Sequence, residues 1–255
     1  MKDHLQSLAK QKVKSNMLEK FALYEQILLR ENAKYNLTAI TNPDEIRQKH
    51  FADSMAILQI PELAPHLQPG HCLLDVGSGA GFPGVPLKIA RPDLHVVLLE
   101  ASAKKCAFLQ MLGKELKLTA PDGKLARLAE ARTGPRAGLE VHNARAEQAA
   151  HNPDLREQFH VVVSRAVAAL PVLCEWCLPF VQVGGVFVAY KGTRERTQEE
   201  LDTAANAIAV LGGEVLYMKH STGTAGERTY IIIEKKRETP QEYPRENRLI
   251  KSKPL

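Results

Sequence analysis

The sequence predicts an α/β fold, in which a Rossmann-like sheet of seven strands, the last of them antiparallel, follows an N-terminal helical extension. Short apolar runs typical of buried strands recur along the chain, and segments with helical spacing such as 103–116 and 197–211 separate most of them. This alternation is expected of a parallel, doubly wound sheet. The expected strands are residues 72–76, 95–100, 139–144, 160–165, 186–191, 214–219 and 229–235.

The last two strands break the alternation. Only "HSTGTAGER", residues 220–228, lies between them, which is too short for the crossover that a parallel pair requires. The final strand should therefore enter the sheet antiparallel.

Residues before the sheet carry apolar side chains at helical spacing from 3 to 58, with a break at "NLTAITNPDE", where Asn and Pro favour a turn. We therefore expect three parts: a helical extension at 1–60, the sheet domain at 61–237 and a basic tail at 238–255. A chain of 255 residues is long enough to bury a full core.

The segment "LLDVGSGAGFPGVP", residues 73–86, joins the first strand to a glycine-rich loop. Gly79, Gly81 and Gly84 fit the dinucleotide pattern GxGxxG, which seats a pyrophosphate on a helix N-terminus. Read from Asp75, the pattern D-x-G-x-G-x-G instead resembles motif I of the S-adenosylmethionine-dependent methyltransferases.

Local chemistry favours the second reading, because the carboxylate of Asp75 would lie near the ligand and repel a dinucleotide phosphate at close range, whereas a sulfonium cosubstrate is positively charged. The closing antiparallel strand also resembles the class I methyltransferase sheet. Glu100, at the end of the second strand, suits a ribose in either reading. The sequence thus favours a methyltransferase over a nicotinamide enzyme.

Charge and cysteine content indicate which binding partners and metal sites to expect. The formal net charge is +5, and residues 235–255 hold seven Lys or Arg against three Glu, a composition that favours a polyanion, although a merely solvated terminus has the same composition. Cys174 and Cys177 form a C-x-x-C in an apolar segment without a second such pair, so we expect buried thiols rather than a zinc or redox site.

No uncharged apolar stretch approaches the roughly 18 residues of a membrane span, and the N-terminus lacks the apolar centre of a signal peptide. We expect a cytoplasmic protein with reduced cysteines and no membrane contact.

Motifs along nearly the whole chain resemble the RsmG (GidB) family, the bacterial 16S ribosomal RNA guanine-N7 methyltransferases. Phe82-Pro83-Gly84 within the glycine loop is the most specific of them. The matching segments are "YNLTAI" (35–40), "KHFADS" (49–54), "LLDVGSGAGFPGVPL" (73–87), "LLEASAKK" (98–105), "RAE" (145–147), "VSRAVA" (163–168), "YKG" (190–192), "GERTYIIIEK" (226–235), "YPR" (243–245) and "KPL" (253–255). The chain departs from the pattern in a longer segment at 118–138 and in Asn247 and Ile250, where the resemblance implies glycine and proline.

The resemblance implies that S-adenosylmethionine donates a methyl group to guanine N7, whose lone pair attacks without a general base. It implies neither a metal nor a covalent intermediate. Catalysis would consist of aligning N7 with the methyl carbon and the sulfur, and of stabilising the positive charge that develops on the guanine ring. Arg165 is the expected catalytic residue and also faces the cosubstrate. The expected cosubstrate-binding residues are Asp75, Gly77, Gly79, Phe82, Glu100, Ala101, Ser102, Ala146, Glu147 and Arg165, with Ala146 and Glu147 at the adenine.

The expected partner is 16S rRNA, within the small ribosomal subunit, bound by a monomer. Basic residues at strand ends and in the tail would contact phosphates: Lys104, Lys105, Arg145, Lys191, Arg228 and Arg245. His50 and Asp53 could cover the cosubstrate or only cap and pack. Two other functions stay open: a methyltransferase-like protein that only binds RNA, and a methyltransferase acting on another RNA or on a protein.

Overall fold

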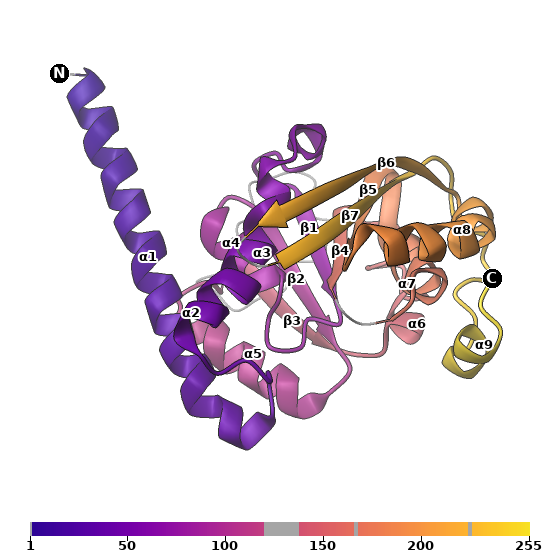
Figure 1. Ribbon diagram of the computed structural model, residues 1–255, viewed down its shortest axis with the longest axis horizontal. Helices are drawn as coiled ribbons and strands as arrows, with labels where there is room; N and C mark the ends of the chain where they lie inside the picture. The colour runs from indigo at the N-terminus through magenta and orange to yellow at the C-terminus, as the bar shows by residue number, and fades with distance from the viewer. Residues whose placement is uncertain (1, 120–137, 166–167, 224–225) are drawn as a thin grey trace.

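The computed structural model describes residues 2–119, 138–165, 168–223 and 226–255. Its seven strands form one mixed sheet in the order β3-β2-β1-β4-β5-β7-β6 (Figure 1). All neighbouring pairs are parallel except β5 with β7 and β7 with β6. The expected fold, including the antiparallel last strand, is confirmed. The predicted insertion lies almost wholly at 120–137, outside the described residues.

The strands are β1 (Cys72–Val76), β2 (His95–Glu100), β3 (Leu139–Asn143), β4 (Phe159–Arg165), β5 (Val181–Lys191), β6 (Gly213–Gly223) and β7 (Gly226–Lys235). The α-helices are α1 (Lys2–Tyr35), α2 (Pro43–Glu45), α3 (Asp53–Met55), α4 (Gly84–Ala90), α5 (Ala103–Glu115), α6 (Ala146–Ala149), α7 (Leu170–Cys177), α8 (Arg194–Val210) and α9 (Asn247–Ser252). A π-helical segment, η1 (Ile46–Ala52), and the 3-10 turns η2 (Ala56–Gln59), η3 (Pro61–His66) and η5 (Leu178–Phe180) complete the chain.

Each face of the sheet has its own core, because successive side chains of a strand point to opposite faces. Leu73 and Ile232 pack with α1, α4 and α5 on one face. Their neighbours Leu74 and Ile231 pack with α7 and α8 on the other. Burial on both faces explains why the central strands are continuous apolar runs.

The N-terminal helices belong to the first of these cores. The N-terminal half of α1 projects away from the body, whereas its second half lies against α4 and α5 (Figure 1). After α1, the Asn42 side chain accepts hydrogen bonds from the backbone of Asp44 and Glu45 and so caps α2. The helical segments α2, η1 and α3 follow one another without a break. They bring polar side chains of this segment to the C-terminal edge of the sheet.

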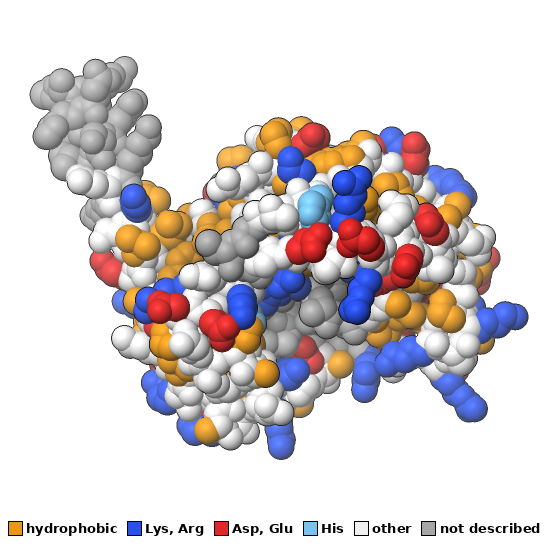
Figure 2. Space-filling model, in the orientation of Figure 1, with side chains coloured by type: hydrophobic (Ala, Val, Ile, Leu, Met, Phe, Trp, Pro, Cys, Tyr) orange, Lys and Arg blue, Asp and Glu red, His pale blue; other side chains and the backbone are white. Residues whose placement is uncertain are grey.

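The segment after β7 folds back over α7 and does not extend into solvent. Arg156 donates to the carbonyl oxygens of Thr239, Pro240 and Tyr243. Arg245 binds the fully buried carboxylate of Glu175. In Figure 2, Lys and Arg side chains stand out over this region, where α9 carries the exposed Arg248 and Lys251. The predicted tail is thus docked, with part of its charge neutralised.

Within the described ranges, no helix is long and apolar enough to cross a membrane.

Candidate cosubstrate and acceptor site

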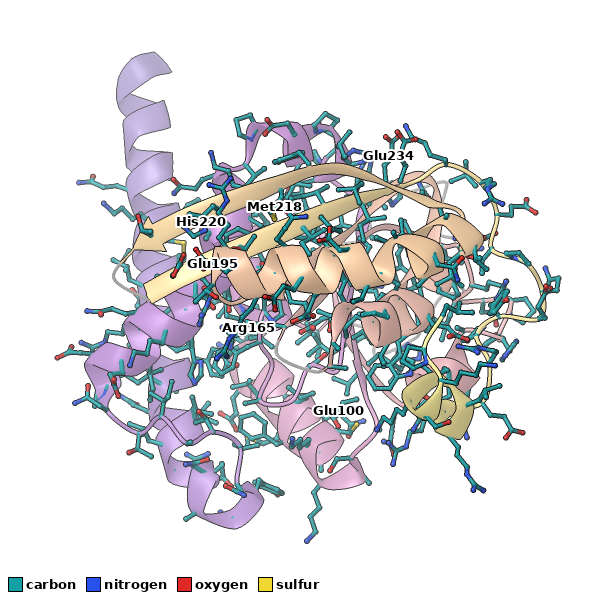
Figure 3. All side chains as sticks on the ribbon, turned by 45° about the vertical axis from the view of Figure 1, so that its right-hand side comes forward. Glu100, Arg165, Glu195, Met218, His220 and Glu234 are labelled. Atoms are coloured by element: carbon teal, nitrogen blue, oxygen red, sulfur yellow. The ribbon has the colours of Figure 1, made fainter. Side chains whose placement is uncertain are left out.

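A cavity of about 460 Å³ opens at the C-terminal ends of β1, β2, β3 and β4. The strand order reverses between β1 and β4, and the crevice at such a point is where open α/β sheets bind ligands. Figure 3 shows Glu100 and Arg165 at this edge, far from Glu234 near the end of β7. The cavity is lined by Leu37, Thr38, His50, Val76, Gly77, Ser78, Gly79, Ala80, Phe82, Leu99, Glu100, Ala101, Lys105, Ala144, Arg145, Ala146, Glu147, Arg165, Trp176 and Asn247.

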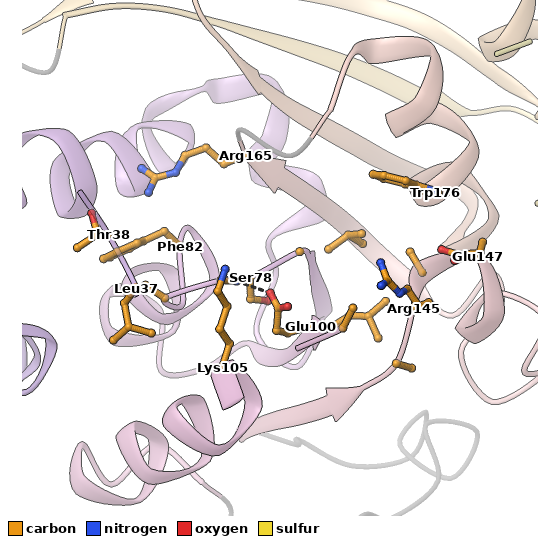
Figure 4. Close-up of a pocket in the computed structure, with 18 of the residues that line it drawn as sticks. Leu37, Thr38, Ser78, Phe82, Glu100, Lys105, Arg145, Glu147, Arg165 and Trp176 are labelled. Atoms are coloured by element: carbon orange, nitrogen blue, oxygen red, sulfur yellow. Dashed lines mark hydrogen bonds between the residues drawn. The ribbon is translucent and has the colours of Figure 1, made fainter. Parts of the chain in front are cut away.

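Glu100 occupies the middle of the cavity (Figure 4). Its Oε2 accepts a hydrogen bond from the Gly79 N–H at 2.9 Å, and its Oε1 accepts one from the Ser102 N–H at 2.8 Å. These bonds fix the carboxylate, whose remaining lone pairs are suited to accept bonds from hydroxyl groups.

The glycines of the loop divide into two pairs. Gly77 and Gly79 line the cavity, and their φ angles of 77° and 58° favour glycine. Gly81 and Gly84 instead pack against the protein, because a Cβ on Gly81 would lie 2.7 Å from the Tyr24 hydroxyl and one on Gly84 2.8 Å from Asp75 Oδ2. The first pair leaves room for a ligand, and the second lets the loop sit close to α1 and β1.

Asp75 lies beneath this loop and does not line the cavity. Its Oδ2 accepts from the Gly84 N–H at 2.9 Å, at the start of α4. Burial raises the pKa of this carboxyl to about 7, partly opposed by the Gly84 bond. Asp75, expected to bind the cosubstrate, is thus not among the lining residues of the cavity, since its carboxyl group holds the loop from below.

One end of the cavity is built from Phe82, His50 and Arg165. The His50 imidazole stacks on the Phe82 ring with centroids 4.4 Å apart, and the Arg165 guanidinium lies 5.0 Å from the same ring. Arg165 Nη2 lies 3.2 Å from His50 Nδ1, which must accept because a guanidinium only donates. His50 Nε2 then donates to Thr38 Oγ1 at 2.8 Å.

Burial, and next the charge of Arg165, lower the pKa of His50 to about 4. The imidazole is therefore neutral near pH 7.

Asp53 joins two strands to the N-terminal helices. Its side chain is 1% exposed, and it binds Arg165 of β4 at 2.9 Å and Arg228 of β7 at 2.8 Å. A buried carboxylate between two guanidinium groups fixes the direction in which each points. The helical extension thus supplies part of the site as well as part of the core.

The other end of the cavity lies on the far side of Glu100 from Phe82 and Arg165. Figure 4 shows Arg145, Glu147 and Trp176 there, opposite Phe82 and Arg165. Trp176 comes from α7, and Asn247 opens α9.

Most of the cosubstrate residues expected from the sequence converge on this cavity. Asp75 and Ser102 are the exceptions; the Ser102 hydroxyl accepts from the Lys105 N–H and caps α5.

The basic residues divide similarly. Lys105 and Arg145 line the cavity, and the Lys105 side chain points into it (Figure 4). Lys104 is exposed outside it. The other three are paired: Lys191 with Glu200 at 2.5 Å, Arg228 with Asp53, and Arg245 with Glu175 at 2.7 Å. Because the Arg245 guanidinium is engaged by Glu175, the expected RNA contact of this residue stays a prediction.

Sequence reasoning left His50 and Asp53 unassigned and did not name nine of the lining residues: Leu37, Thr38, Val76, Ser78, Ala80, Leu99, Ala144, Trp176 and Asn247. The segments "YNLTAI" and "KHFADS" contain the N-terminal site residues Leu37, Thr38, His50 and Asp53. Both segments match the family pattern, and this match could have marked those residues as part of the site. Nothing local marked Trp176, which lies in an apolar segment.

Comparison with known proteins adds a family to this geometry. A family model described as "GidB: rRNA small subunit methyltransferase G" matches residues 17–230. The chain belongs to this family. The chain is 41% identical over 242 residues to a ribosomal RNA small subunit methyltransferase G of Desulfitobacterium hafniense, covering 94% of this chain and 90% of that protein. A protein of the same name from Alkaliphilus metalliredigens is 38% identical over 248 residues, covering 95% and 92%.

Solved structures agree with the family in fold. The chain is similar to an O-methyltransferase of Bacillus cereus in complex with SAH, with a TM-score of 0.53 and 18% identity over 82% of this chain and 89% of that one. A putative O-methyltransferase of Klebsiella pneumoniae gives a TM-score of 0.53 at 12% identity, over 84% and 90%. At these identities the likeness shows the class I methyltransferase fold alone.

Proposed function

We propose that the protein transfers a methyl group from S-adenosylmethionine to N7 of a guanine in 16S rRNA. The observation that carries this proposal is the cavity with a fixed carboxylate at its centre and an aromatic and guanidinium cluster at one end. Family membership supports the rRNA acceptor, since the relatives are named for methylation of small-subunit ribosomal RNA.

The residues present fit the cosubstrate. Two glycines leave backbone space beside Glu100, whose free lone pairs suit the two hydroxyls of a ribose. Small side chains, Ala101, Ala144 and Ala146, leave a slot for a flat ring beyond it. The bound cosubstrate would supply an electrophilic methyl group on a sulfonium, at the end lined by Phe82 and Arg165.

The acceptor chemistry suits the groups at that end. Guanine N7 already carries a lone pair, so the reaction needs alignment of N7 with the methyl carbon and sulfur and no base to remove a proton. The neutral His50 imidazole, which Phe82 supports from one side, offers a ring against which a base can stack. Arg165, held by Asp53, has donors for the O6 atom of the guanine and orients the acceptor.

Phosphates of the RNA would be held by the cations around the cavity mouth. Lys105 and Arg145 line it, and Lys104 is exposed beside them. These contacts fix the position of the RNA without reading its sequence. Lys191, Arg228 and Arg245 form ion pairs with carboxylates of the fold. We therefore rank them below Lys104, Lys105 and Arg145 as contacts to RNA.

The test is incubation of the protein with labelled S-adenosylmethionine and small subunits from a strain that lacks the activity. We expect one methyl group on N7 of a single 16S rRNA guanine, located by reduction and aniline cleavage. Arg165→Ala should lower transfer about 100-fold, as loss of one oriented donor does in other enzymes. Cys174→Ser, a buried thiol in α7, is the matched control and should keep the activity.

Label on protein, or on a guanine position that resists aniline, would refute the acceptor assignment. Tight RNA binding without any transfer would favour the binding-protein alternative.

A further inference from the structure

The C-terminal segment forms part of the cavity wall. Asn247 is the first residue of α9 and lines the cavity beside Trp176 of α7. Figure 4 shows Trp176 at the end with Arg145 and Glu147, away from Phe82 and Arg165. Asn247 belongs to the same end, because Arg245 and Lys251 of its segment contact Glu175 and Trp176 of α7. A segment that the sequence assigns to RNA by its charge therefore also reaches the proposed cosubstrate.

Two polar atoms on this wall lack hydrogen-bond partners. Neither Trp176 Nε1 nor Asn247 Oδ1, both buried, is hydrogen-bonded within the part of the chain that the structure describes. Trp176 is 8% exposed. Buried polar groups are nearly always paired in native proteins, so an unpaired donor and an unpaired acceptor on one cavity wall point to a ligand that supplies both.

The wall is held firmly in place. The Arg245 side chain and backbone N–H bind Glu175, the residue before Trp176. Ile250 is fully buried in the core beneath α9, and Lys251 Nζ lies 5.5 Å from the centroid of the Trp176 ring. With Arg245 and Ile250 anchored on either side of Asn247, its carboxamide retains freedom mainly about its own side-chain bonds.

We propose that Asn247, with the Trp176 indole N–H, binds the adenine edge of the cosubstrate. Adenine carries a 6-amino donor next to ring-nitrogen acceptors, and a carboxamide is the side chain that matches such an adjacent donor and acceptor. Rotation of the carboxamide presents either its oxygen or its nitrogen to the cavity. Trp176 Nε1 is a donor only, so it would pair with a ring nitrogen. The inference rests on the proposed cosubstrate and adds residues that read its base.

A contact with RNA is the competing role for Asn247. The arrangement favours the adenine, because Asn247 lines the cavity, whereas the side chains of this segment that suit phosphates, Arg248 and Lys251, are exposed and are not among the lining residues. The two roles differ in which affinity a substitution at Asn247 changes.

The experiment measures the affinities of wild type, Asn247→Ala, Leu249→Ala and Trp176→Phe for S-adenosylhomocysteine and for adenosine by calorimetry, and their affinities for 16S rRNA in a separate binding assay. Leu249 lies on the same helix and is 43% exposed, which makes its variant the matched control. We expect Asn247→Ala to lower the affinity for both ligands by the same factor, about three- to tenfold for the loss of one neutral hydrogen bond. Leu249→Ala should match wild type, and Trp176→Phe should weaken both ligands while keeping an aromatic ring.

Equal wild-type and Asn247→Ala affinities for both ligands would overturn this inference alone. So would a loss confined to rRNA affinity, which would assign Asn247 to the RNA. Failure of folded wild-type protein to bind S-adenosylhomocysteine would overturn the proposed function, and this inference with it. Unfolding midpoints of each variant separate a lost contact from a lost fold.

Discussion

Replacing Arg245 by alanine should destabilise the protein by removing most of the counter-charge of a buried carboxylate. The Glu175 side chain is 0% exposed and accepts from Arg245 Nε at 2.8 Å and Nη2 at 2.7 Å, and from the Arg245 backbone N–H at 2.8 Å. Only the backbone bond survives in Arg245→Ala. Breaking a buried pair by removing one partner costs about 3–5 kcal/mol.

We expect the lower end of that range, about 3 kcal/mol, because the Arg245 side chain is 18% exposed and already partly hydrated. At about 2–4 °C per kcal/mol for a domain of this size, Tm should fall by about 6–12 °C. Urea unfolding gives the free energy directly, and a thermal scan gives Tm.

The control is Arg248→Ala, which removes an exposed cation from the same segment and should change stability by less than about 0.5 kcal/mol. Adding Glu175→Gln to Arg245→Ala should restore part of the loss, because no buried charge then lacks a partner. If Arg245→Ala unfolds like Arg248→Ala and instead weakens RNA binding, the guanidinium acts in solution and the docked tail is refuted.

Three further predictions concern the site and the core. Glu100→Gln should weaken S-adenosylhomocysteine at least about tenfold by calorimetry, since bonds to a charged acceptor are worth more than neutral ones; unchanged affinity would mean that the ribose does not reach Glu100. Since the pKa of folded His50 is about 4 against 6.5 when unfolded, its contribution to stability is present above pH 6.5 and lost as the pH falls toward 4. Urea unfolding at pH 7, 6 and 5 should therefore show a shallower loss for His50→Gln, and parallel slopes would contradict the buried placement. All four cysteines are buried, and burial raises the pKa of the Cys174 and Cys177 thiols, so a thiol reagent should label none of them until the protein unfolds.

The sequence predicted strands best where apolar runs coincide with pairing. The strand at His95–Glu100 has the predicted limits. By contrast β5 begins at Val181 and not at residue 186, since Gly184 and Gly185 interrupt the apolar pattern at a point where the register with β4 shifts. β6 continues to Gly223 because it pairs with β7 beyond its apolar residues, through Thr222 and Glu227.

The sequence predicted those site residues that lie next to a strand end. It did not predict those whose partners are far away in the sequence. Glu100 and Arg165 follow from the rule that ligands bind at the C-terminal ends of parallel strands. Asp53 does not, because its partners are 112 and 175 residues away. Glu175 gave a signal that was not used: it is the one charged residue of "LPVLCEWC", and a carboxylate in so apolar a helix requires a buried cation.

Contributions to one cavity from both ends of the chain have a consequence for its synthesis on the ribosome. Asp53 leaves the exit tunnel early, but Arg165 and Arg228, which bind its carboxylate, are made 112 and 175 residues later. Asn247 is made later still. The cavity wall is therefore incomplete in any nascent chain that stops before Asn247, even after the whole sheet has been synthesised.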